Sequence, residues 1–246
     1  MTVIGKVIEL WRYPVSSVAG ERVEALDISP AGVRGERNFG VVDSQTGAVA
    51  RPAVEDRWQR TVSVRARHTE AGTVEVKTAA SGWMEPLSAA ASAALSDHFG
   101  FPTEIRPYQD REAAAGYSGP WAVNRYQPSV VHLLTTASMA ELRRLHPQGD
   151  PDRRRFRPNI VVEMPAVEGA FPETEWIGRT IRIGSMEFRI EEPTRRCGLT
   201  VIAHDDLPHD PDILRQLVRG NFRNLGVYCA PAISGAVQAG DTVHLG

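Results

Sequence analysis

The sequence predicts a mostly β protein with helical additions, organised as one or two β-barrel-like units. Short runs of alternating apolar residues, separated by turn residues, recur along the chain of 246 residues. Only a few stretches show helical periodicity, and the length suits one large domain or two small ones. Many short strands with few helices favour barrels over a parallel sheet wrapped in helices.

The first third of the chain is predicted to be short strands joined by turns. The strands are expected at residues 3–10, 23–28, 39–42, 61–66 and 73–77. The turn sequence at residues 43–47 predicts a hairpin with a loop longer than the tight two-residue kind. A helix is predicted over residues 88–99, because Gly100 suits its C-terminal cap and Pro102 stops it.

A polar stretch at residues 108–119 predicts the boundary between an N-terminal domain, 1–107, and a C-terminal domain, 108–246. Beyond it, strands are expected at residues 129–134, 160–162, 226–229 and 242–245, with a hairpin over residues 180–190. The helical additions therefore have to fall between these strands.

Two helix starts are predicted in the C-terminal part from their capping residues. Ser138 has capping-box spacing with Glu141, so a helix is expected to begin there and end before residue 147. Asp210 followed by Pro211 is typical of an N-cap and a first helical residue, and Gly220 is expected to close that helix.

Composition excludes several classes of function. The net charge is −2, so no broad basic surface calls for a nucleic acid. No apolar run is long enough to span a bilayer, and the first residues do not form a secretion signal. Two cysteines argue against a disulfide framework or a Cys-rich zinc site. We therefore expect a cytoplasmic protein with reduced thiols, no nucleic-acid partner and no membrane.

Cys197 is the first candidate for a functional residue, because it follows two arginines in the sequence Glu-Pro-Thr-Arg-Arg-Cys-Gly at residues 192–198. The alternating residues before it predict a strand that ends at Pro193. Adjacent guanidinium groups favour the thiolate, which is the form that attacks or ligates metals. The alternative is a small buried apolar residue, as free cysteines often are, and Cys229 is expected to be such a core residue.

Three further features could converge on this thiol. Arg157 and Asn159 adjoin a predicted strand that would hold their side chains firmly, whereas Arg153 and Arg154 are expected on a solvated basic edge. The guanidinium of Arg37 follows two turn residues and could point inward, or could form a surface ion pair. The serines of residues 13–17 could hold an oxyanion or only form a turn.

Histidines offer weaker candidates. His132 lies in an apolar strand and is expected to be a satisfied core residue rather than a base. A metal site is imaginable where two histidines and two aspartates lie close together, but a polar loop is the preferred interpretation of these residues: His204, Asp205, Asp206 and His209.

Several motifs together resemble the MOSC-domain proteins, a family named after the C-terminal domain of molybdenum cofactor sulfurase. The resemblance covers nearly the whole chain and includes an N-terminal MOSC-associated β-barrel domain. Its marks are Tyr-Pro-Val-Ser-Ser at 13–17, Gly-Glu-Arg at 35–37 with Phe-Gly-Val-Val-Asp at 39–43, Arg-Phe-Arg-Pro-Asn-Ile at 155–160, Glu-Trp-Ile-Gly at 175–178 and Arg-Cys at 196–197.

The resemblance implies a MOSC β-barrel domain whose Cys197 is functional, with a smaller β-barrel domain before it. In the amidoxime-reducing branch the matching cysteine ligates molybdenum, and a phosphate-bearing pterin cofactor lies between the two domains. In other branches it is proposed to carry sulfur as a persulfide. By match to the motifs, the implied cofactor-binding residues are Ser17, Arg37, Thr135, Arg157, Asn159 and Arg196.

Two positions depart from the molybdenum-binding branch. Ser16 stands where that branch usually has lysine, which removes a positive charge from the expected phosphate site. Thr194 stands where a second cysteine often occurs, three residues before Cys197. That second cysteine is not the metal ligand.

Three functions follow as hypotheses. The first is a molybdenum oxidoreductase that reduces N-hydroxylated or N-oxide compounds with electrons from a separate flavin or iron–sulfur protein. The second is a sulfur carrier, or a protein that acts on carbon–sulfur bonds, which uses Cys197 without molybdenum and is supplied by a cysteine desulfurase. The third is a non-catalytic module that binds a phosphate-bearing small molecule.

Overall fold

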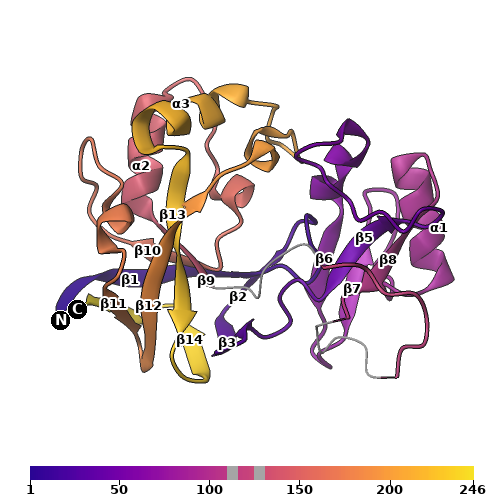
Figure 1. Ribbon diagram of the computed structural model, residues 1–246, viewed down its shortest axis with the longest axis horizontal. Helices are drawn as coiled ribbons and strands as arrows, with labels where there is room; N and C mark the ends of the chain where they lie inside the picture. Colours follow the sequence, from indigo (N-terminus) through magenta and orange to yellow (C-terminus); the bar gives the residue numbers. More distant parts are fainter. Residues whose placement is uncertain (110–115, 125–130) are drawn as a thin grey trace.

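The computed structural model describes residues 1–109, 116–124 and 131–246, which form two units side by side (Figure 1). The predicted mostly β fold with a barrel is confirmed. Parts of the polar stretch at 108–119, and the start of the strand predicted at 129–134, lie outside the described residues.

A closed barrel of seven strands forms the larger unit, in the order β10-β9-β13-β12-β11-β15-β1, with β1 pairing back to β10. Neighbouring strands are antiparallel except β9 and β10, which are parallel. The strands are β1 (Thr2–Arg12), β9 (Val131–Thr135), β10 (Ile160–Glu163), β11 (Thr180–Ile183), β12 (Met186–Arg195), β13 (Asn224–Pro231) and β15 (Thr242–Leu245). Strand β2 (Glu21–Val23) extends the sheet beside β1.

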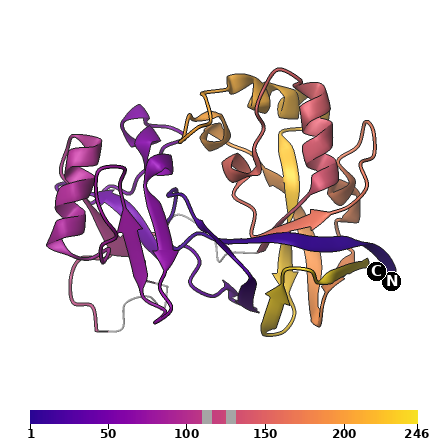
Figure 2. The ribbon, with the colours of Figure 1, turned by 180° about the vertical axis from the view of Figure 1, so that it is seen from behind.

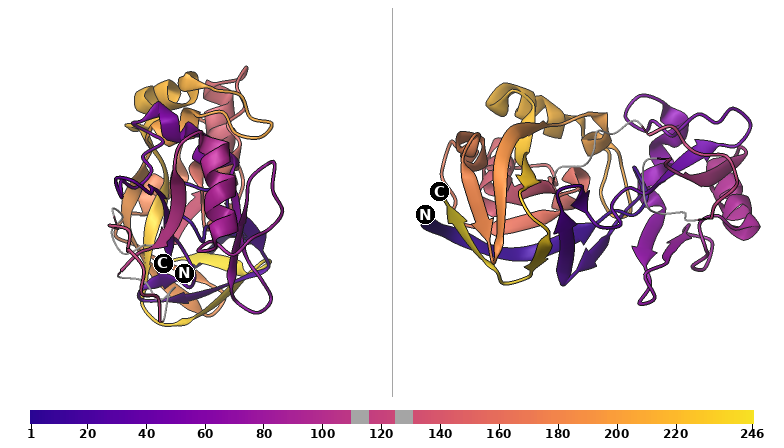
Figure 3. Two further views of the ribbon diagram at one scale, coloured as in Figure 1. Left: turned by 90° about the vertical axis from the view of Figure 1, so that its right-hand side faces the viewer. Right: turned by 60° about the horizontal axis from the view of Figure 1, so that its bottom comes forward.

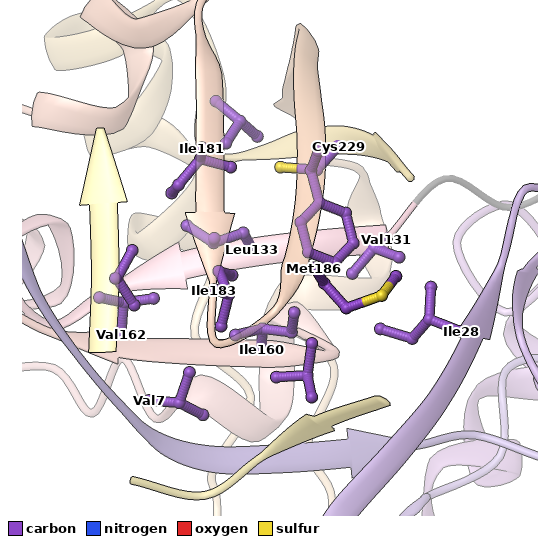
Figure 4. Packing of buried hydrophobic residues seen from close by; sticks show 14 of the residues in the cluster. Val7, Ile28, Val131, Leu133, Ile160, Val162, Ile181, Ile183, Met186 and Cys229 are labelled. Atoms are coloured by element: carbon purple, nitrogen blue, oxygen red, sulfur yellow. The ribbon is translucent and has the colours of Figure 1, made fainter. Parts of the chain in front are cut away.

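The barrel interior is filled by apolar side chains from nearly every strand (Figure 4). Ile181 and Ile183 of β11 point inward while the residue between them is exposed, as the period of two along a strand requires. Cys229 lies among these residues and is 1% exposed, so its predicted place in the core is confirmed. The core thus depends on strand alternation.

The first strand of the chain completes the barrel of the C-terminal half. Strand β1 lies between β15 and β10, and Figure 2 shows it running from the barrel to the other unit. A small sheet of β14 (Gly235–Gln238), β3 (Ala25–Ser29) and β4 (Gly32–Val33) links the two halves again. The boundary between 107 and 108 stays a prediction, and on the N-terminal side of it β1 and β3 pair with C-terminal strands.

The smaller unit has its own core around Trp58 and two short sheets. Its elements are β5 (Phe39–Asp43) paired with β8 (Thr103–Pro107), β6 (Arg65–His68) paired with β7 (Val74–Lys77), the 3-10 helix η1 (Asp56–Ser63) and α1 (Ala89–Phe99). The predicted helix is confirmed, with Ser88 and Gly100 as its caps.

Two predictions in this unit are wrong. Residues 61–63 belong to η1, because the alternating pattern continues a helical turn there before β6 begins. The main partner of β5 is β8, and the expected hairpin is reduced to one bridge between Val42 and Val49. Alternation predicted the strands but not their partners.

Two α-helices lie together at one end of the barrel, as two further views show (Figure 3). They are α2 (Thr136–Leu145) and α3 (Pro211–Asn221), and three 3-10 helices accompany them: η3 (Arg153–Phe156), η4 (Pro172–Trp176) and η5 (Gly198–Val201). Among the described residues, no helix is long and apolar enough to cross a membrane.

The helix boundaries correct two predictions. Helix α2 begins at Thr136 rather than Ser138, because the Thr135 hydroxyl accepts from the Ser138 N–H and is the N-cap. Helix α3 has the expected Asp210 cap but does not end at Gly220. A Cβ at Gly220 would meet Leu145 Cδ1 at 2.9 Å, so this glycine serves the contact with α2.

Candidate functional site

Cys197 is exposed on the turn between β12 and η5, which we call the thiol turn (residues 196–200). The N–H and hydroxyl of Thr200 both donate to the Cys197 carbonyl, at 3.1 and 3.0 Å. These bonds fix the backbone of the turn and leave the thiol at the surface. The alternative of a buried structural cysteine is therefore wrong.

The strand before the thiol does not end at Pro193, as the sequence predicted. Strand β12 continues to Arg195, and its pairing with β13 shifts between Ile190 and Glu192 and again after Pro193. A proline cannot donate a hydrogen bond, and an irregularity of this kind accommodates it within a strand. The longer strand carries Cys197 to the end of the barrel.

Arg196 was expected to bind a cofactor, and the structure gives its guanidinium a bracing role. It is 7% exposed and donates to the carbonyls of Phe156 at 2.8 Å and Leu225 at 2.6 and 3.0 Å. It also donates to His132 Nε2 at 2.6 Å. Burial lowers the pKa of Arg196 to about 10. The side chain thus ties the thiol turn to three other segments from inside.

His132 is a satisfied core residue, as predicted, and it also connects two site arginines. Its Nε2 accepts from Arg196, so Nδ1 carries the proton and donates to the Arg157 carbonyl at 3.1 Å. Burial, and then the charge of Arg196, lowers the pKa of His132 well below its usual range. The imidazole is therefore neutral and acts as a fixed link between Arg196 and Arg157.

Arg157 lies where the two units meet. Its guanidinium lies 4.0 Å from the centre of the Tyr13 ring, and Nη1 donates to the Val18 carbonyl. The Tyr13 hydroxyl donates back to the Pro158 carbonyl at 3.3 Å. Burial raises the pKa of Tyr13, so its hydroxyl stays protonated. The predicted site role of Arg157 receives a firm position from these contacts.

Asn159 uses most of its amide to hold the barrel together. Its Oδ1 accepts from the His132 N–H at 3.1 Å, and its Nδ2 donates to the Trp11 carbonyl at 3.2 Å. Its backbone also pairs with both of these residues. Asn159 therefore joins β9 and β1 beneath the site, and its predicted contact with a cofactor stays a prediction.

Thr135 was also expected near a cofactor, and it is completely buried. Its hydroxyl donates to Glu173 Oε2 at 2.8 Å and accepts from the Ser138 N–H at 3.1 Å. Ser138 donates to the same carboxyl oxygen. Burial raises the pKa of Glu173. Thr135 thus caps α2 in the structure, and the cofactor role implied by its motif has no further support.

Ser17 and Arg37 come together through two paired loops. The Arg37 N–H donates to the Tyr13 carbonyl at 2.7 Å, and the Ser16 N–H donates to the Phe39 carbonyl at 2.9 Å. Glu36, 1% exposed, accepts from the Tyr13 N–H at 2.7 Å and pairs with Arg37 Nε at 3.2 Å. The ion pair is thus turned inward rather than lying at the surface.

Backbone strain gathers at three of the predicted residues. Ser17, Arg37 and Arg157 have φ angles of +65°, +49° and +52°, a region that residues with a Cβ rarely adopt. Each such residue costs about 1–3 kcal/mol, and such residues cluster at binding and catalytic sites. Motif matches and backbone geometry therefore select the same three positions.

A cavity of about 280 Å³ lies between the two units beside Arg157. Its wall includes Trp11 and Tyr13 from one side and Leu199 of the thiol turn from another. The ion pair between Arg65 and Asp205, at 3.0 Å, crosses from the smaller unit to the barrel at its edge. The cavity thus reaches the turn that carries Cys197.

Arg155 is a residue that sequence reasoning left out of the site. It is 2% exposed, and its guanidinium donates to the carbonyls of Thr200, Ile202 and Pro208 at 3.4, 3.1 and 2.7 Å. It holds the segment after the thiol turn, as Arg196 holds the segment before it. Its place in the run of arginines before Arg157 was the one available signal.

The remaining polar candidates have other partners. Arg153 pairs with Glu9, and Arg154 pairs with Asp152 at 3.0 Å and Asp206 at 2.9 Å. No group of three or more acidic, histidine or cysteine side chains that could hold a metal ion occurs in the described part of the chain. Burial lowers the pKa of His204 to about 4.

The fold and site define a class: a closed β-barrel with an attached second unit, and an exposed thiol near their junction. The sequence matches the MOSC domain over residues 123–244 and the MOSC N-terminal beta barrel domain over residues 4–117. The chain belongs to the MOSC family, whose domains are associated with molybdenum cofactor sulfurases and related enzymes. A comparison with curated proteins finds no match.

Solved structures show the same fold at low sequence identity. The YUAD protein from Bacillus subtilis is 12% identical with a TM-score of 0.51, over 98% of this chain and 94% of that one. YiiM from Geobacillus stearothermophilus is 12% identical with a TM-score of 0.36, over 47% of this chain and 53% of that one. These likenesses concern the fold alone.

Proposed function

We propose that this MOSC protein is a molybdenum-cofactor-binding oxidoreductase that reduces N-hydroxylated or N-oxide compounds, with Cys197 as the metal ligand. The observation that carries the proposal is the exposed thiol of Cys197 on a turn braced by buried Arg196. A soft thiolate suits a sulfur-rich metal environment. A fixed turn would hold that ligand without movement of the backbone.

The residues around the turn fit a phosphate-bearing pterin. The Ser16 hydroxyl is buried and has no hydrogen-bond partner among the described residues. Ser17, Arg37 and Arg157 are held in strained conformations around it, and guanidinium groups match phosphate oxygens well. We infer that Ser17, Arg37 and Arg157 would hold the phosphate and pterin, with Asn159 positioning the strands behind them.

When bound, the cofactor would supply two-electron oxygen-atom transfer. The protein's residues would bind and orient it, and Cys197 has to lose its proton to become a ligand. Cys197 and Cys229 are the chain's only two cysteines, and the usual iron–sulfur cluster needs four thiolates. Electrons would therefore come from a separate flavin or iron–sulfur protein.

A second candidate function is sulfur transfer, which the exposure of Cys197 also favours. Ser16 in place of the lysine of the molybdenum-binding branch removes one positive charge from the phosphate site. In this role the Cys197 thiolate would attack the outer sulfur of a persulfide on a cysteine desulfurase. The desulfurase cysteine would leave as a thiolate, and Cys197 would keep the persulfide.

The first test measures molybdenum and pterin in protein from a host that makes the cofactor. Wild type is expected to hold nearly one molybdenum per chain, and Cys197→Ala to hold almost none. Cys229→Ala is the matched control, because that thiol is buried in the barrel, and it should keep its metal. Wild type without molybdenum under these conditions would refute the proposal.

The second test asks what each loaded protein does. Wild type should reduce an N-hydroxylated amidine with a chemically reduced dye as electron source, and Cys197→Ala should not. For the alternative, intact mass after incubation with a cysteine desulfurase and cysteine should show one added sulfur on Cys197. No added sulfur would remove the alternative without affecting the first proposal.

A further inference from the structure

Phe222 is the most exposed large apolar side chain among the described residues, at 88%. It is also the C-cap of α3 with φ at +50°, a conformation for which glycine or asparagine is usual. Val218, one helical turn earlier, is 52% exposed on the same side. Phe222 therefore costs the fold backbone strain and gains no burial, which points to a contact outside the chain.

The corner that carries Phe222 lies against the thiol turn. The pairing of β12 with β13 ends at Arg195 opposite Asn224, and the Arg196 N–H then donates to the Arg223 carbonyl at 2.8 Å. Arg223 Nε donates back to the Arg196 carbonyl. Continued by one residue, this register places Phe222 opposite Cys197. Helix α3 leads directly into β13 at this end of the barrel (Figure 1).

The charges around this aromatic residue are positive. Arg195 and Arg219 are exposed, and neither guanidinium has an ion pair or hydrogen bond within the described part of the chain. The Arg223 guanidinium bonds a carbonyl, which leaves its charge unneutralised. The acid on this side of α3, Asp212, is paired with Arg215 at 2.7 Å. An apolar centre with a basic rim remains.

We propose that the Phe222 face, made of Val218, Phe222, Arg195, Arg219 and Arg223, is the docking surface for a small acidic electron-transfer protein. The assignment rests on the proposed function, because that function needs a separate electron donor. An aromatic anchor inside a charged rim is a common arrangement of protein interfaces, and complementary charge speeds encounter. A donor seated here would bring its redox group beside Cys197, where the metal would be bound.

The test measures the dissociation constants of two acidic probes, a [2Fe–2S] ferredoxin and a flavodoxin, at low ionic strength of about 20 mM. Phe222→Ser and Arg219→Glu are each expected to weaken binding of at least one probe about tenfold or more. The Arg219→Glu effect should shrink in about 0.5 M salt, where exposed charges are screened. Ile233→Ser and Arg182→Glu change an exposed apolar residue and an exposed arginine elsewhere, and should stay within about twofold.

Three outcomes would overturn this assignment. They are equal binding by the variants and their controls, no binding of either probe by wild type, and a Phe222→Ser loss seen only with a cysteine desulfurase. Molybdenum content, measured on the same preparations, separates this proposal from the previous one. Metal present with unchanged probe binding would refute only the docking surface, whereas metal absent with the expected binding losses would refute only the cofactor.

Discussion

The two cysteines of this chain lie on the same pair of strands and have opposite surroundings. Cys229 sits on β13 opposite Ile190 of β12, inside the barrel core, and burial raises the pKa of its thiol. Cys197 follows the end of β12 and is exposed. The comparison teaches that the barrel wall makes one sulfur inert, while the network of Arg196 and His132 holds the other in place without covering it.

The largest expected contrast is in chemical reactivity. In cofactor-free native protein, a thiol reagent such as iodoacetamide should modify Cys197 readily and Cys229 at least about a thousandfold more slowly. Modification of Cys229 requires opening of the barrel, which costs several kcal/mol. Peptide mass spectrometry over time measures both rates. Comparable rates for the two thiols would break the comparison.

A second contrast separates neighbouring arginines. Arg196→Met should lower the free energy of unfolding by about 3–5 kcal/mol, because Phe156, Leu225 and His132 would lose their buried donor. Arg195→Met, at the exposed neighbouring position, should change it by no more than about 0.5 kcal/mol. Urea unfolding measures both. Equal effects would show that the bracing network adds little stability.

The neutral state of His132 predicts a dependence on pH. Its folded pKa lies well below its usual value, so below about pH 6.5 the unfolded chain binds a proton that the folded protein does not. Stability from this residue is therefore complete above pH 6.5 and is lost as the pH falls. Between pH 7.5 and 5 the loss should be about 2 kcal/mol.

Urea unfolding of wild type and His132→Gln at these two pH values measures that share. The comparison with the variant is needed because burial raises the pKa of Glu173, whose contribution to stability changes in the opposite direction. His132→Gln should be less stable than wild type at pH 7.5 and should show a weaker dependence on pH. The same dependence in both proteins would mean that His132 does not titrate on unfolding.

The smallest effect concerns the thiol turn itself. Thr200→Val removes the hydroxyl bond to the Cys197 carbonyl but keeps the backbone bond. The expected loss of stability is about 1 kcal/mol. Thr242→Val, at an exposed strand position, should change stability by less than about 0.5 kcal/mol. A Thr200→Val protein as stable as the control would show that the turn does not depend on this hydroxyl.

Sequence patterns predicted elements more reliably than they predicted partners. Alternation found β11 and β12, and capping residues found α1 and α3, because both signals are local. The closure of the barrel by β1 was not visible, because pairing between residues far apart in the chain leaves no local pattern. The same limit hid the contact between α2 and α3 that places Gly220 inside its helix.

The candidate site divides in the same way. Motifs selected Cys197, Ser17, Arg37 and Arg157, and the structure holds the last three in strained conformations. The motifs could not tell a side chain at the surface from one behind it, so Arg196 was expected to face a ligand. Arg155 went unselected because its partners are backbone carbonyls, which carry no signal in the sequence.

The most direct test of the central claim combines metal content with thiol protection in protein loaded with the cofactor. The fraction of chains whose Cys197 resists alkylation should equal the fraction that holds molybdenum, and removal of the metal should restore labelling. Cys197 that is labelled completely in fully loaded protein would contradict the account, because a thiolate bound to the metal cannot react with the reagent.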